Sequence, residues 1–127
     1  MVVDDDRMIR EMTVTALSYC VNREVMSFDS GLAAWDYIGR GGLTDLVITD
    51  VDMPELNGLE LLERIREDTL PIRVVIMSGV AENESRARRH GADAFLAKPF
   101  EVKDLFRIVQ TFVIEADSET HCWSPPA

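Results

Sequence analysis

The regular alternation of short apolar runs with helical patterns is the feature that most constrains the fold of this chain. Each of five strand-like runs is followed by a segment with apolar residues at helical spacing. Because adjacent parallel strands cannot be joined by a hairpin, this alternation predicts parallel strands linked by right-handed helical crossovers. The expected strands are Val2–Val3, Glu24–Phe28, Leu46–Asp50, Val74–Met77 and Ala94–Ala97. The expected helices are Arg7–Cys20, Gly31–Ile38, a segment after Asn57-Gly58, Glu82–His90 and Val102–Glu115. We therefore predict one doubly wound α/β domain of three layers.

The domain boundaries follow from where the pattern ends. No helical spacing continues past Glu115, and the remaining residues include Ser124-Pro125-Pro126. We therefore predict a domain over residues 1–115 and a C-terminal tail or linker over residues 116–127. The first strand contains only Val2 and Val3, so either it is short or the start of the chain is trimmed.

The composition narrows the function classes. With 127 residues, 46% of them hydrophobic and 28% charged, the chain is typical of one soluble globular domain. Its net charge of −10 argues against binding to nucleic-acid phosphates or to anionic membranes. No apolar run has membrane-spanning length and no signal segment follows Met1, so we expect a cytoplasmic protein. Cys20 and Cys122 lack metal-ligand spacing, which predicts a buried free thiol at Cys20 and a reducing compartment.

Polar residues follow four of the predicted strands. The carboxyl ends of parallel strands meet at one edge of a sheet, which is where such folds bind ligands. Clustered carboxylates repel one another unless a cation compensates, and oxygen ligands suit Mg²⁺. A metal, a hydroxyl and an ammonium are the groups that phosphoryl transfer requires. The residues concerned are Asp4, Asp5, Asp50, Asp52, Ser78 and Lys98.

Each of these residues also has an ordinary interpretation. The Asp4-Asp5-Asp6 run could be a solvated terminus or a helix cap, Ser78 could cap the next helix, and Lys98 could lie on the surface. Independent caps and surface residues do not explain why acids, a hydroxyl and a lysine all stand at successive strand ends.

The motifs around these residues resemble the receiver domains of bacterial two-component response regulators, including the chemotaxis-regulator type. The resemblance covers residues 1–115 and implies a flavodoxin-like domain, a five-stranded sheet of order 2-1-3-4-5 flanked by five helices. The matching segments, in order, are Val2–Asp6, Leu46–Pro54, Asn57–Leu62, Val75–Gly79 and Gly91–Phe100.

The resemblance implies a role for each acidic residue. Asp50 is expected to be the phosphoacceptor. Asp5 and Asp50 are expected to bind the metal directly, with the backbone carbonyl of Asp52, while Asp4 binds through water. The expected ion is Mg²⁺, with Mn²⁺ as a substitute.

Further roles fall on the later strands. Ser78 and Lys98 are expected to contact the phosphoryl group, and Phe95 to report the position of Ser78. Pro99 is expected to follow a cis peptide. The family often has tyrosine at the Phe95 position and alanine at the Gly79 position, so a phenolic hydrogen bond is lost and the loop after Ser78 could be looser. Asp52 and Val80 are expected to flank the path of the water that hydrolyses the phosphorylated state.

The implied function is a phosphoacceptor switch, a signalling domain rather than an enzyme. Its partners would be a sensor histidine kinase or a phosphotransfer protein and an output domain or protein that the sequence does not identify. Phosphorylation could produce a homodimer, and neither nucleic acid nor membrane is an expected partner. Whether the chain is a stand-alone regulator or part of a longer one stays open.

Three alternatives remain. Asp50-Val51-Asp52 has the spacing of the nucleophile and acid in haloacid-dehalogenase-type phosphatases, but that family places its nucleophile on the first strand and its metal-binding acids later. A flavodoxin-like binding module needs a phosphate-cradling loop where this chain has Asp4-Asp5-Asp6. A degenerate receiver used only for protein contacts would have lost some of the key residues, all of which are present.

A few other residues receive structural interpretations. Met8, Met12, Met26 and Met77 are expected to fill the core, and Trp35 to pack on the second helix. The run Arg86, Arg88 and Arg89 is expected on a solvated helix face, and His90 at a helix C-terminus.

Overall fold

The computed structural model describes residues 1–21 and 23–114. Its strands are β1 (Val2–Val3), β2 (Ser27–Phe28), β3 (Leu46–Asp50), β4 (Arg73–Ser78) and β5 (Ala94–Ala97). Its helices are α1 (Arg7–Cys20), α2 (Gly31–Gly39), α3 (Gly58–Glu67), α4 (Glu82–Arg89) and α5 (Val102–Val109), which continues as the π-helical segment η1 (Gln110–Ile114). The predicted tail, residues 116–127, and residue 115 lie outside the described residues.

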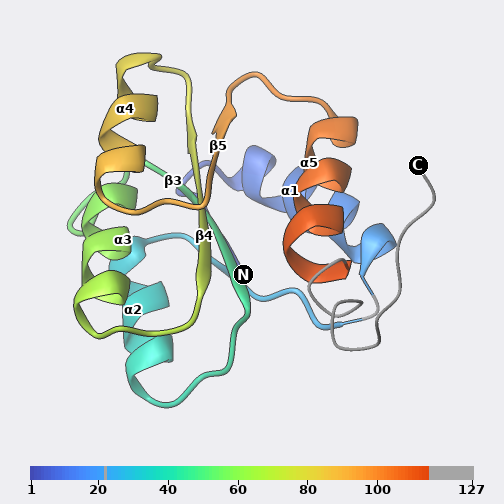
Figure 1. The fold of residues 1–127 in the computed structure, drawn as a ribbon. Helices are drawn as coiled ribbons and strands as arrows, with labels where there is room; N and C mark the ends of the chain where they lie inside the picture. Colours follow the sequence, from blue (N-terminus) through green and yellow to red (C-terminus); the bar gives the residue numbers. More distant parts are fainter. Residues whose placement is uncertain (22, 115–127) are drawn as a thin grey trace.

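The five strands form one parallel sheet of order β2-β1-β3-β4-β5, which confirms the predicted fold class. Helices α2, α3 and α4 cover one face, and α1 and α5 cover the other (Figure 1). Side chains of β3 and β4 alternate between the two cores: Val47 and Val74 face the first, Ile48 and Val75 the second. The central strands are therefore buried on both faces, as expected for a parallel sheet.

The helix starts follow from local chemistry. Asp6 accepts hydrogen bonds from the N–H groups of Met8 and Ile9 and so caps α1. Ser30 caps α2 through Ala33 N–H, and Asn57 forms a capping box with Glu60 at the start of α3. The cap of α4 is Ala81, which makes no side-chain cap, so Ser78 is not a helix cap.

Two expectations about the elements are corrected. Strand β2 begins at Ser27 rather than Glu24, because it pairs only with the two residues of β1. Met8 and Met12 are 80% and 47% exposed rather than in the core. A step of four residues overshoots a helical turn by about 40°, so the series Ala16, Met12, Met8 rotates away from the buried face.

Among the remaining structural interpretations, those of Met77, Trp35 and His90 are confirmed, whereas Met26, expected in the core, is only half-buried. Met77 is fully buried, Trp35 packs against the core under α2 and α3, and His90 is the C-cap of α4. Cys20 is a free thiol but only half-buried, and it hydrogen-bonds to Ala16 O. No helix within residues 1–21 and 23–114 is both long and apolar enough to cross a membrane.

Candidate functional site: an acidic cluster at the carboxyl edge

Parallel pairing brings the acidic residues of two distant segments together. Register Val3↔Thr49 sets the ends of β1 and β3 side by side, so that Asp4 and Asp5 follow one strand where Asp50 ends the other. One carboxylate oxygen from each of these three residues lies within 4.8 Å of the others. Asp4 and Asp50 are buried, whereas Asp5 is exposed. The cluster is therefore closed on the protein side and open to solvent at Asp5.

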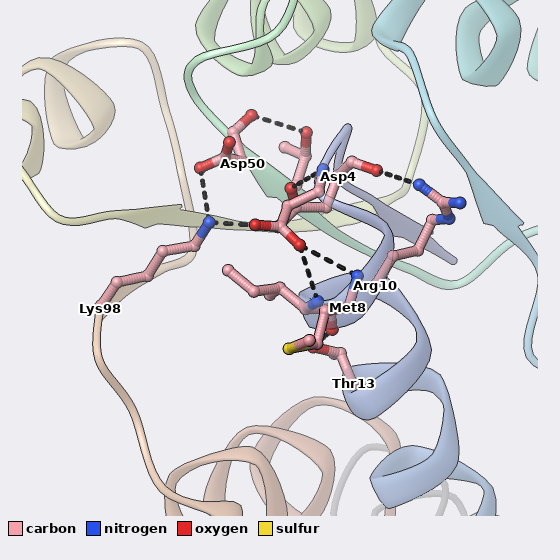
Figure 2. Close-up of polar contacts among 9 residues, drawn as sticks. Asp4, Met8, Arg10, Thr13, Asp50 and Lys98 are labelled. Carbon is pink, nitrogen blue, oxygen red and sulfur yellow. Dashed lines mark hydrogen bonds and ion pairs between the residues drawn. The ribbon is translucent and has the colours of Figure 1, made fainter.

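Lys98 joins the two buried carboxylates. Its Nζ donates to Asp4 Oδ2 at 3.1 Å and to Asp50 Oδ1 at 3.0 Å (Figure 2). The residue follows β5, and its long side chain reaches back past β4 to the end of β3. Its backbone N–H donates to Ser78 O, and its bond to Pro99 is a cis peptide.

The electrostatics of the cluster reflect its burial. Burial raises the pKa of Asp50; the hydrogen bond and charge of Lys98 oppose this rise, and the charges of Asp4 and Asp52 add to it. Burial also disfavours the Lys98 ammonium, but its bonds to Asp50 and Asp4 outweigh that effect and raise its pKa. One cation thus serves two buried carboxylates, and negative charge remains in excess at this edge.

These residues suit a divalent cation. Three converging carboxylate oxygens are the ligands that Mg²⁺ and Mn²⁺ prefer, and the exposed side at Asp5 leaves room for the water ligands that Mg²⁺ retains. The excess of negative charge favours such an ion. Asp52 is exposed and close enough for its charge to act on Asp50.

The backbone around the cluster is fixed by short contacts. Asp4 Oδ1 accepts from Asp6 N–H, and the Asp4 carbonyl accepts from Arg10 at 2.8 Å. The hydroxyl of Thr49 donates to the Asp50 carbonyl at 3.0 Å. In the Asp4-Asp5-Asp6 run, therefore, only Asp6 is the helix cap, while Asp4 and Asp5 belong to the acidic cluster.

The other predicted site residues lie on β4, on β5 and in the loop after β4, at different depths. Ser78 ends β4 and is 2% exposed, with its Oγ accepting from Val80 N–H at 3.0 Å. Val80 is 45% exposed. Phe95 is half-buried against the core beneath α4. A Cβ added at Gly79 would lie 3.9 Å from its nearest neighbour, so alanine would fit there.

Sequence reasoning missed several residues that support the site. Asn83 is buried and donates to Ser78 Oγ, although the sequence predicts an exposed helix at this position. Arg86, which is exposed as predicted, donates to Asn83. Gly58 lies against the Asp50 backbone. Asn83 and Ala87 are the two buried positions of α4, at i and i+4. That spacing is the signal that could have identified Asn83.

The strand order and the acidic carboxyl edge are those of a flavodoxin-like domain of the receiver class. The family model described as the response regulator receiver domain matches residues 1–110. The chain therefore belongs to the response regulator receiver domain family.

Individual relatives support this family membership. The chain is 31% identical over 104 residues to chemotaxis protein CheY1 of Helicobacter pylori, covering 79% of this chain and 84% of that protein. It is 37% identical over 114 residues to the DNA-binding transcriptional regulator NtrC of Azospirillum brasilense, covering 87% of this chain. The chain spans only 23% of NtrC and 56% of response regulator Rre1 from Synechocystis.

Solved structures share the fold. The receiver domain of Francisella response regulator 1452 superposes with a TM-score of 0.81 at 26% identity, covering 91% of this chain and 95% of that one. The receiver domain of NarL from Mycobacterium tuberculosis gives 0.79 at 30% identity, covering 87% and 90%.

Proposed function

We propose that this domain is the phosphoacceptor switch of a two-component phosphorelay, with Asp50 as the acceptor in a Mg²⁺-dependent reaction. The observation that carries the proposal is the Lys98 ammonium held between Asp4 and Asp50, beside three converging carboxylates. Catalysis of phosphoryl transfer consists mainly of positioning and charge neutralisation, and this edge supplies both.

In the proposed step, an Asp50 carboxylate oxygen attacks the phosphorus of a phosphohistidine on the donor protein. The new O–P bond forms as the N–P bond breaks. The electron pair of the N–P bond stays on the imidazole nitrogen, which takes up a proton. Asp5, Asp50 and the Asp52 carbonyl would hold the metal, with Asp4 through water, and the ion would supply charge neutralisation for the phosphoryl oxygens. Lys98 moves its contact from the Asp50 carboxylate to a phosphoryl oxygen, and the Ser78 hydroxyl donates to another.

The donor would be a sensor histidine kinase or a phosphotransfer protein. To bring a phosphohistidine to Asp50, it must cover the surface around the acidic cluster. Met8, at the start of α1 and four residues after Asp4, is 80% exposed, and Val80 is 45% exposed after Ser78. Burying these apolar side chains would stabilise the complex. We assign the start of α1 and the loop after β4 to the donor contact.

The proposal extends to the whole chain. Residues 1–115 form the receiver and residues 116–127 a tail or linker, and the domain acts in the cytoplasm. Phosphorylation shifts the surface of α4, β5 and α5 between two conformations, which an output domain or protein detects.

Intact mass spectrometry with acetyl phosphate tests the proposal. With Mg²⁺ the wild type should gain one phosphoryl group, and Asp50→Asn should gain none. Persistence of the adduct in Asp50→Asn would show that another residue is the acceptor. Sustained hydrolysis of a phosphate monoester such as p-nitrophenyl phosphate would favour the haloacid-dehalogenase-type alternative instead.

A further inference from the structure

The hydroxyl of Ser78 is held from the side of α4. Asn83 Nδ2 donates to Ser78 Oγ at 2.9 Å, and Val80 N–H donates to the same oxygen at 3.0 Å. Ser78 is 2% exposed and Asn83 5%, so the bond between them is shielded from water. Within the described residues, these two are the hydrogen bonds of Ser78 Oγ, and neither comes from the acidic cluster.

The orientation of the Asn83 amide is fixed by a third residue. Arg86 Nη1 donates to Asn83 Oδ1 at 3.1 Å from one turn further along α4. A guanidinium can only donate, so the atom it contacts must be the amide oxygen, and the amide nitrogen must face Ser78. Asn83 therefore acts toward Ser78 as a donor and not as an acceptor.

The two donors fill the accepting capacity of the Ser78 hydroxyl. A serine hydroxyl has one proton and two lone pairs, and the Val80 and Asn83 donors occupy both lone pairs. With both lone pairs occupied, the proton is the group that Ser78 can offer to a phosphoryl oxygen on Asp50. Moving the hydroxyl toward that oxygen draws Oγ away from the two donors on the α4 side. This movement of Ser78 would leave the amide of Asn83 buried and without its hydrogen-bond partner. The cost of an unpaired buried donor therefore disfavours the movement.

We propose that Asn83 is a restraining residue, which stabilises the unphosphorylated position of Ser78 and so disfavours the phosphorylated conformation of the domain. This inference rests on the proposed function. It concerns the α4 side of the switch, whereas the acidic cluster carries the chemistry. The polarity of Asn83 makes the inference testable with two variants of opposite effect.

The probe is beryllofluoride, which binds an aspartate carboxylate as a phosphoryl mimic. Its affinity can be measured by ¹⁹F NMR at fixed Mg²⁺ and fluoride. Asn83→Leu keeps the branched shape of the side chain and cannot donate, so it should raise the affinity about three- to tenfold. Asn83→Asp presents an acceptor to Ser78, takes the hydroxyl proton that the mimic needs, and should lower the affinity below that of the wild type. These changes correspond to the range of net values measured for single hydrogen bonds.

A double variant separates restraint from general structural damage. In a Ser78→Ala background the restraint has nothing to hold, so adding Asn83→Leu should change the affinity less than about 1.5-fold. Three results would each overturn the inference: changes of the same size with and without Ser78, changes of the same sign for Asn83→Leu and Asn83→Asp, or affinities of both variants within twofold of the wild type. If the wild type itself bound no beryllofluoride with Mg²⁺, the proposed function would fail instead.

Discussion

Gly58 lies against the backbone of Asp50 so closely that a Cβ at position 58 would stand 2.1 Å from the Asp50 carbonyl oxygen. The same Cβ would meet Thr49 Oγ1, which donates to that carbonyl, at 3.2 Å. The first residue of α3 is therefore packed directly against the strand end that carries the candidate phosphoacceptor, and only glycine allows that approach.

Gly58→Ala should consequently destabilise the domain and displace Asp50. Because the obstacle is backbone, which cannot rotate away, we expect a loss of about 1–3 kcal/mol in the free energy of unfolding. Urea denaturation measures it. Gly39→Ala is the matched control, since no described atom beyond its chain neighbours and its own helix backbone lies within 4 Å of its Cβ, and alanine favours a helix. Equal stability of the Gly58→Ala and Gly39→Ala proteins would contradict the packing argument.

Asp93 connects two elements at the opposite edge of the sheet from the site. Its Oδ2 accepts from Arg66 at 2.8 Å and from Val74 N–H at 2.8 Å. Asp93→Ala would leave the buried Val74 N–H without this acceptor, so we expect a loss of about 1–3 kcal/mol in the free energy of unfolding. Glu11→Ala removes the exposed ion pair with Arg7 and should change stability by about 0.5 kcal/mol or less. Thermal or urea unfolding of both variants would decide, and equal losses would contradict the assigned role of Asp93.

Lys98 is the one cation between two buried carboxylates of the described cluster, and Lys98→Met tests that arrangement. Without Mg²⁺ the variant should melt below the wild type, because Asp4 and Asp50 lose their shared partner. Added Mg²⁺ should then raise its melting temperature by more than it raises that of the wild type. Phosphorylation by acetyl phosphate should slow.

Two further variants, one a test and one a control, locate the Mg²⁺ response. Asp5→Ala should abolish most of the Mg²⁺-induced rise in melting temperature, because it removes a candidate ligand. Asp36→Ala removes a distant exposed carboxylate and should leave the rise intact. If Asp5→Ala kept the full Mg²⁺ response, the ion would bind elsewhere.

Much of the fold could be predicted because its strand-helix alternation is local information. The placement of Asp4, Asp50 and Lys98 at one edge of the sheet could also be predicted, since it follows from parallel strands. That β1 lies beside β3 came from the strand order that the resemblance implies. The bridge that Lys98 makes between both acids could not, because it depends on how a long side chain crosses β4. The sequence overestimates strand β2 because the length of this strand is set by the two residues of β1 that pair with it.

The errors on the helices have one physical origin. Which residues of a helix face inward depends on its rotation against the sheet, and short apolar series do not determine that rotation. Met8 and Met12 share a four-residue spacing with buried Ala16 but lie outside, whereas polar Asn83 lies inside. The restraint on Ser78 is therefore hidden in a helix that looks entirely solvated by composition.

The lifetime of the phosphorylated state should depend on Val80. The hydrolytic water must approach in line with the bond between phosphorus and the Asp50 oxygen, and the side chains expected beside this path are those of Asp52 and Val80. Both are exposed, Val80 to 45%, so water can reach them. Val80 has no group to orient a water, which limits the proximity advantage and predicts slow hydrolysis.

Val80→Gln can hold a water and should change the dephosphorylation rate several-fold while leaving Mg²⁺ affinity nearly unchanged. Val80→Leu, equally unable to bond water, is the matched control and should keep the wild-type rate. The rates follow from loss of the phosphorylated mass over time. If Val80→Gln, alone or with Asp52→Asn, moved the rate less than about twofold, which is roughly 0.4 kcal/mol of barrier, these side chains would not control water access.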